Sequence, residues 1–239
     1  MTGRRLLLIS NGSELLGEQP SEFFLAAVKD FLGAGVRRVA FVPYASVVKS
    51  YDDYAARVRS RFGGLGYEVE PVHEDENPAA VVRRADAVAV GGGNTFHLLK
   101  LMYETGVLEA VRERASGGLP YIGWSAGSNV ACPTVRTTND MPIVEPPSLD
   151  ALALVPFQIN PHYTDATIEN HHGETRDERL GEFTHANPGV RVVGLREGTM
   201  LRVEGSGARL LGARPARLFL KGEPPRDISP AEPFDFLLA

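Results

Sequence analysis

The clearest sequence signal of a catalytic residue is Gly-Trp-Ser-Ala-Gly at residues 123–127, which fits the pattern G-x-S-x-G. A short apolar run precedes this segment and small residues follow it, so the pattern indicates a strand, a tight turn and a helix. In such a turn the serine hydroxyl is exposed, and N–H groups at the start of the helix can stabilise negative charge that develops during acyl transfer. We therefore predict that Ser125 is a nucleophile. The alternative is a structural turn that contains a serine by chance.

A second turn, Gly-Gly-Gly-Asn-Thr at residues 91–95, also follows an apolar run and opens a helical segment. Both turns then lie at the carboxyl edge of a parallel sheet, where open α/β sheets bind ligands. Glycines let the backbone approach a substrate closely, so we expect N–H groups of Gly92, Gly93 and Ala126 to form an oxyanion hole and Asn94 to contact substrate. A phosphate-binding loop is the rival interpretation, but Phe96 stands where G-x-G-x-x-G needs its third glycine.

A serine nucleophile needs a base, and the chain has six histidines. His162 is the best placed of them, because it follows the short apolar segment Gln158–Pro161 and stands at a strand end. His73 lies in an acidic stretch and is interpreted as a solvated surface residue. The adjacent His171 and His172 lack the H-E-x-x-H spacing of a zinc site, so we expect no metal there and no organic cofactor.

Two carboxylates are candidates for the acid that orients the histidine. Glu197 ends a predicted strand before Gly198, and Asp140 closes the segment Thr-Thr-Asn-Asp at residues 137–140. The chain order Ser125–Asp140–His162 would match that of α/β-hydrolases, whereas the order Ser125–His162–Glu197 would not. Residue types and spacing alone leave this choice open.

The elements that must position these side chains follow an alternating pattern. We predict strands at 5–10, 38–43, 67–72, 85–90 and 120–124, and helices at 21–32, 51–62, 78–84, 95–103 and 107–115. After a proline-rich irregular segment at 133–161 we predict a helix at 176–185 and short strands at 190–195, 200–204, 208–212 and 217–220. Apolar strands interleaved with helices favour a three-layer α/β fold, mainly parallel, with helices on both faces of the sheet. We expect one catalytic domain over residues 1–239.

Bulk properties argue against several other classes of protein. The net charge is −5, from 25 basic and 30 acidic residues, and basic residues do not cluster, so we expect no nucleic-acid partner. No apolar run approaches the roughly 20 residues of a membrane helix, so we expect no membrane partner. Cys132 is the single cysteine, which excludes an internal disulfide. A reducing, cytoplasmic location is expected.

With these motifs assembled, the chain resembles the peptidase E family of α-aspartyl dipeptidases, serine peptidases with a class I glutamine amidotransferase-like fold. The resemblance implies a catalytic triad of Ser125, His162 and Glu197, with Arg176 holding the aspartate side chain of an Asp-Xaa dipeptide. It implies hydrolysis through an aspartyl-enzyme ester, no cofactor and a homodimer, and it leaves Asp140 as a substrate-binding residue of undefined role. The matching segments lie in the same order, at residues 90–96, 121–127, 136–144, 158–162 and 173–176.

Other functions on the same fold stay open at this point. A cyanophycinase-like enzyme or another serine hydrolase would share the fold, whereas a glutamine amidotransferase normally carries cysteine at the position of Ser125. A catalytically silent small-molecule binding protein is the non-enzymatic alternative.

Overall fold

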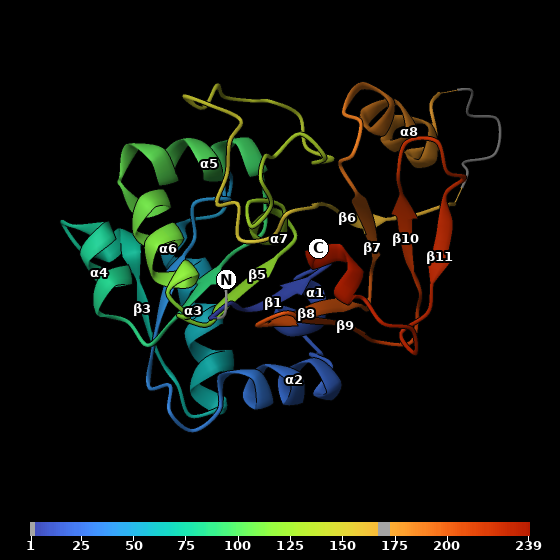
Figure 1. Ribbon diagram of the computed structural model, residues 1–239. Coiled ribbons are helices and arrows are strands. Elements are labelled where there is room, and N and C mark those ends of the chain that lie inside the picture. The colour runs from blue at the N-terminus through green and yellow to red at the C-terminus, as the bar shows by residue number, and fades with distance from the viewer. Residues whose placement is uncertain (1–2, 167–172) are drawn as a thin grey trace.

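The large sheet is the scaffold of the molecule (Figure 1). The structure, a computed structural model, describes residues 3–166 and 173–239, so His171 and His172 lie outside the described residues. Strands β1 to β5 run parallel, and β8 and β9 continue the sheet antiparallel, in the order β3-β2-β4-β5-β1-β8-β9. The bounds are β1 Arg5–Ile9, β2 Arg38–Val42, β3 Glu68–Pro71, β4 Ala87–Val90, β5 Tyr121–Trp124, β8 Met200–Glu204 and β9 Gly207–Leu211.

Helices cover both faces of this sheet, as the continuous apolar strands predict. Along β1, Leu7 and Ile9 face the side covered by α2 and α3, while Leu6 and Leu8 face the side covered by α4, α5 and α6. The short helix α1 lies against α2 and α3, and α7 follows β5. The bounds are α1 Ser13–Leu16, α2 Glu22–Leu32, α3 Tyr51–Gly64, α4 Pro78–Arg84, α5 Thr95–Glu104, α6 Val107–Ser116 and α7 Ala126–Asn129.

A smaller sheet with the order β11-β10-β7-β6 stands beside the large one, at the right of Figure 1. Strands β6 and β7 are parallel, and β10 and β11 are antiparallel to their neighbours. Helix α8 packs Leu180 against this sheet, in a cluster with Tyr163, Val192 and Phe219. The bounds are β6 Gln158–Tyr163, α8 Arg176–Ala186, β7 Val192–Arg196, β10 Ala216–Phe219 and β11 Arg226–Ile228, with 3-10 turns η1 at Val72–Glu74 and η2 at Asp235–Leu238.

The segment between α7 and β6 is irregular, as its prolines predict, but it is shorter than the expected 133–161. Its last residues belong to β6, because Gln158 to Pro161 pair with β7. Leu152, Val155 and Phe157 are buried, so the segment contributes to the core although it forms no helix.

In the described ranges, no helix has both the length and the apolar character needed to cross a membrane.

Candidate active site

Ser125 lies on a sharp turn between β5 and α7. Its φ of 54° and ψ of −114° form a backbone conformation that residues other than glycine rarely adopt. The flanking glycines make the turn possible: a Cβ on Gly123 would lie 2.3 Å from the carbonyl oxygen of Gly127, and one on Gly127 would lie 2.1 Å from that of Val90. The N–H of Ser125 donates to the carbonyl of Ile9 at 3.0 Å, which fixes the turn to β1.

His162 lies at an irregularity in β6. The register with β7 shifts between Pro161 and Tyr163, which makes His162 an extra residue in the ladder, with a φ of 53°. Its N–H donates to Oγ of Ser10 at 3.0 Å, and the Ser10 hydroxyl donates to the carbonyl of Leu195 at 2.7 Å. Ser10 is fully buried directly after β1 and so connects two strands of the small sheet, β6 and β7, to the large sheet.

The side chains of Ser125, His162 and Glu197 meet where the two sheets adjoin. Nε2 of His162 lies 2.9 Å from Oγ of Ser125, and Nδ1 lies 2.6 Å from Oε1 of Glu197. Glu197 follows β7, just before Gly198 (φ 80°) turns the chain toward β8. Both distances are within hydrogen-bond reach, so the imidazole can take a proton from the hydroxyl while the carboxylate holds its tautomer.

Asp140, the competing acid, lies elsewhere in the site. Its Oδ2 accepts from the backbone N–H and the hydroxyl of Thr95, at 2.8 and 2.6 Å, at the start of α5. The structure therefore brings Glu197 to His162 and places Asp140 at a helix N-terminus, where a negative charge is stabilised.

Asn94 is the N-cap of α5. Its Oδ1 accepts from the N–H of His97 at 3.0 Å, and its Nδ2 donates to the carbonyl of Met141 at 2.9 Å. Asn94 and Asp140 both line the cavity beside Ser125, and both also fix the 138–143 loop to α5.

One of the three N–H groups expected to form the oxyanion hole, that of Gly92, already has a hydrogen-bond acceptor. The N–H of Gly92 donates to the hydroxyl oxygen of Tyr54 at 3.0 Å, and Nε1 of Trp124 donates to the same oxygen at 2.7 Å. Burial raises the pKa of Tyr54 to about 12, so its hydroxyl is neutral. Ala126 begins α7, where N–H groups have no acceptor inside the helix, and Gly93 lies in the neighbouring turn. Gly93 and Ala126 are thus the donors that we keep as candidates.

Arg176 is the first residue of α8 and is half-buried. Burial, followed by the neighbouring charge of Arg179, lowers the pKa of Arg176. The ordinary pKa is so high that the guanidinium keeps its charge at neutral pH. A cavity of about 970 Å³ is lined by Ser125, His162 and Arg176 together, which places a cation and the reacting pair around one space.

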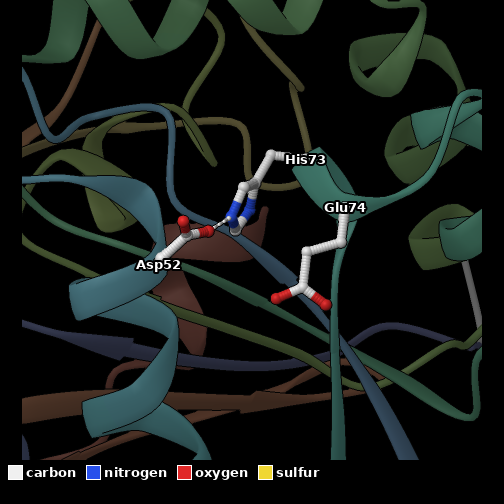
Figure 2. Close-up of side chains that lie close together, drawn as sticks. All are labelled: Asp52, His73 and Glu74. Carbon is white, nitrogen blue, oxygen red and sulfur yellow. Dashed lines mark hydrogen bonds and ion pairs between the residues drawn. The ribbon is translucent and has the colours of Figure 1, made fainter.

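Another group of ligand-type side chains, Asp52, His73 and Glu74, lies outside this cavity (Figure 2). Nε2 of His73 lies 3.0 Å from Oδ1 of Asp52, and the His73 side chain is only 13% exposed, so its interpretation as a solvated residue is wrong. Tyr51 packs against the imidazole, with 5.4 Å between the ring centroids. Both oxygens of Glu74 accept from Arg59, at 2.7 and 2.6 Å, so a guanidinium already neutralises the carboxylate that a metal would need. We propose no metal there.

Two contributors to the site were not foreseen from the sequence. Ser10 directly follows an apolar strand, and a polar residue at the end of a parallel strand is a usable signal. Tyr54 lies inside α3, and nothing in its sequence context distinguishes it from a core tyrosine.

Acyl transfer through a serine ester is the chemistry that this fold and these contacts support, which places the chain among the serine hydrolases. A cysteine nucleophile is not available, because Cys132 is buried and burial raises its pKa to about 12. Comparison with known proteins makes the class specific: the chain belongs to Peptidase family S51, whose model matches residues 6–211. It is a serine peptidase.

Curated relatives agree with this assignment, and a solved structure agrees with the fold. The chain is 50% identical over 235 residues to Peptidase E of Nostoc sp., covering 98% of this chain and 97% of the relative. It is 54% identical to Peptidase E of Streptomyces coelicolor, covering 94% and 90%, and 46% identical to a Drosophila melanogaster protein named "Probable alpha-aspartyl dipeptidase", covering 100% and 99%. A peptidase from an acI-B1 Actinobacterium has the same fold, with a TM-score of 0.73 at 18% identity over 97% and 96% of the two chains. The predicted α/β class is confirmed.

Proposed function

We propose that this serine dipeptidase hydrolyses Asp-Xaa dipeptides, with Ser125 as nucleophile, His162 as general base and acid, and Glu197 as its orienting carboxylate. The observation that carries the substrate assignment is the half-buried Arg176 on the wall of the cavity that holds Ser125 and His162. A planar guanidinium pairs with a carboxylate through two parallel hydrogen bonds, which suits an aspartate side chain. The name of the Drosophila relative is consistent with this substrate.

In the acylation half-reaction, Nε2 of His162 takes the hydroxyl proton as Oγ of Ser125 attacks the scissile carbonyl carbon. Glu197 accepts from Nδ1 of the imidazole and stabilises the imidazolium that forms. The N–H groups of Gly93 and Ala126 donate to the carbonyl oxygen as it becomes an oxyanion. His162 then gives its proton to the leaving amine, the C–N bond breaks, and the aspartyl ester of Ser125 remains.

In the deacylation half-reaction, His162 removes a proton from water as the water oxygen attacks the ester carbonyl. The proton passes to Oγ of Ser125 when the ester bond breaks, which releases aspartate and restores the enzyme. Arg176 holds the β-carboxylate throughout, while Asp140 and Asn94 keep the loop that borders the substrate in place.

Arg176→Met tests the assignment of the substrate. Loss of a charge-assisted pair is expected to lower kcat/KM for Asp-Leu by about 10- to 100-fold, with little change for Asn-Leu. The matched control is Arg179→Met, which removes an exposed arginine of the same helix that pairs with Glu174. Both variants are compared with the wild type by their initial rates on Asp-Leu, Glu-Leu, Asn-Leu and N-acetyl-Asp-Leu.

Two results of that experiment would contradict the proposal. An equal loss on Asp-Leu and Asn-Leu would remove the recognition role of Arg176. Turnover that survives Ser125→Ala would remove the serine mechanism as a whole.

We propose further that the enzyme is cytoplasmic, forms a homodimer and acts as one catalytic domain. A single, buried cysteine supports a reducing compartment. The reacting serine and histidine come from different sheets, which supports one catalytic unit rather than two. The dimer rests on the family resemblance, and sedimentation equilibrium tests it; a monomer at micromolar concentration would contradict it.

A further inference from the structure

Arg57 lines the cavity but has no part in the proposed function. It lies on α3, where two later arginines have other partners: Arg59 pairs with Glu74, and Arg61 donates to the carbonyl of Gly17 at 2.6 Å. The guanidinium of Arg57 instead lies against the ring of Tyr54, with its central carbon 5.7 Å from the ring centroid. A cation over an aromatic face is held in place without losing its charge.

A series of contacts locates Arg57 relative to the nucleophile. The hydroxyl of Tyr54 accepts from the N–H of Gly92 and from Nε1 of Trp124, and Trp124 immediately precedes Ser125. Arg57 is therefore on the wall of the cavity formed by α3 and the end of β5.

Arg176 comes from a different element of the cavity wall, helix α8. Oγ of Ser125 contacts His162 at 2.9 Å, and the next residue, Tyr163, donates from its hydroxyl to Asp177, the neighbour of Arg176 on α8. The cavity thus presents one arginine from a helix of the large sheet and one from the helix of the small sheet, and Ser125 stands between them in this series of contacts.

An Asp-Xaa dipeptide has matching charges. Its β-carboxylate belongs to the acyl part, and its terminal carboxylate belongs to the leaving amino acid, one residue beyond the scissile bond. When Arg176 holds the β-carboxylate, the terminal carboxylate needs a second cation, and α3 supplies one to the same cavity. We propose, on the basis of the proposed function, that Arg57 binds the C-terminal carboxylate of the substrate and so restricts the enzyme to dipeptides. A third residue would present a neutral amide at this position.

Lys49 is the other cation on this side of the cavity, and it is a weaker candidate. It follows Val48, whose side chain is 97% exposed, in the loop between β2 and α3. No aromatic ring among the described residues holds its ammonium group, and a flexible ammonium forms no paired hydrogen bonds with a carboxylate.

The test compares Asp-Leu with Asp-Leu amide, which lacks only the terminal charge. The wild type is expected to favour Asp-Leu by about tenfold in kcat/KM, the size of one charge-assisted contact at a solvated site. Arg57→Met removes the charge but keeps a long, unbranched side chain, and it is expected to lower kcat/KM for Asp-Leu by about tenfold while leaving the amide unchanged. Arg57→Lys should recover part of the preference, and Arg83→Met, an exposed arginine of α4 outside the cavity, should change neither rate.

Each remaining outcome decides the question. Equal effects of Arg57→Met on the two peptides, or a preference abolished by Lys49→Met and retained in Arg57→Met, would overturn the assignment of Arg57 but leave the proposed function intact. A wild-type enzyme that cleaves neither peptide would instead overturn the proposed function, and the role of Arg57 with it.

Discussion

Ser125 and His162 are both non-glycine residues with positive φ, at 54° and 53°. Such conformations cost of order 1–3 kcal/mol each and persist only where surrounding contacts impose them. Glycines on both sides of Ser125 allow its turn. The N–H of His162 does not pair with β7, and it donates instead to the hydroxyl oxygen of Ser10. At this scale the site is two strained residues that hydrogen bonds to the buried residues Ile9 and Ser10 hold in position.

Ser10→Ala removes the hydroxyl on which this arrangement depends. The variant leaves the N–H of His162 and the carbonyl of Leu195 without their partner, so we expect a stability loss of about 1–3 kcal/mol. Because His162 then loses a positional restraint, kcat should fall by about tenfold with little change in KM. Urea unfolding and steady-state kinetics on Asp-Leu measure the two effects.

The control for Ser10→Ala is Thr184→Val in α8, which removes another buried hydroxyl, bound to the carbonyl of Gly181. It should lose stability with kcat unchanged. A Ser10→Ala enzyme with full kcat would show that His162 needs no such restraint.

Among the elements, the turn after β5 depends on a close backbone approach that side chains would prevent. Gly127→Ala would place a Cβ 2.1 Å from the carbonyl oxygen of Val90 in the adjacent strand, where only backbone movement can relieve the clash. We expect a loss of about 3 kcal/mol or more, as for overpacking in a core. Gly181→Ala, in α8 with no atom within 4 Å of the added Cβ, should instead gain about 0.5–1 kcal/mol. Thermal unfolding of both variants gives the comparison, and equal effects would contradict it.

The elements also show where prediction from sequence succeeds. Helix α4 begins and ends where its Asn-Pro start and double arginine predict, at Pro78–Arg84, and β8 matches the predicted 200–204. Ser125 was identifiable because a strand, a glycine pattern and small following residues all indicate one turn. Local signals of this kind depend on neighbours in the chain, which the sequence displays directly.

Local signals could not predict the small sheet or the carboxylate that contacts His162. Strands β7 and β10 are only 5 and 4 residues long, and which sheet they join depends on pairing between distant segments. The contact between His162 and Glu197 depends on an extra residue in β6. Ser10, which accepts a hydrogen bond from the N–H of His162, lies 152 positions away in the sequence. Spacing therefore left Asp140 and Glu197 equivalent, and the family resemblance was needed to choose between them.

For the whole molecule, acidic pH should be the destabilising direction. Several carboxyl groups have a lowered pKa, mainly because they accept hydrogen bonds. They are Asp30, Glu74, Asp75, Asp86, Asp165 and Glu178. A carboxyl whose folded pKa is below its unfolded value stabilises the fold above the unfolded value, and this stabilisation is lost as pH falls through the folded pKa. Unfolding free energy should therefore be level from pH 7 to about 5.5 and fall below about pH 4.5.

Asp86→Asn tests this pH dependence at one group. The carboxylate accepts from the N–H groups of Arg38 and Arg37, at 2.9 and 3.1 Å, and these bonds lower its pKa. The variant should be less stable than wild type by about 1 kcal/mol at pH 7, and the difference should shrink as pH approaches 3. Urea unfolding across this range is the measurement, and a difference that grows with acidity would contradict the assignment.

The path of the chain between the two sheets affects how the enzyme is made. Strand β8 pairs with β1 along its full length, so residues 5–9, which also pair with β5, gain their second neighbour only after residues 200–204 have left the ribosome. Such distant pairing makes folding slow and dependent on nearly the whole polypeptide. We expect Glu197 to become ordered in the same late step, since it lies on the connection that leads into β8. The proposed triad is therefore assembled only after the segments that carry Ser125 and His162 have long been made, because its third member waits for the pairing of β8.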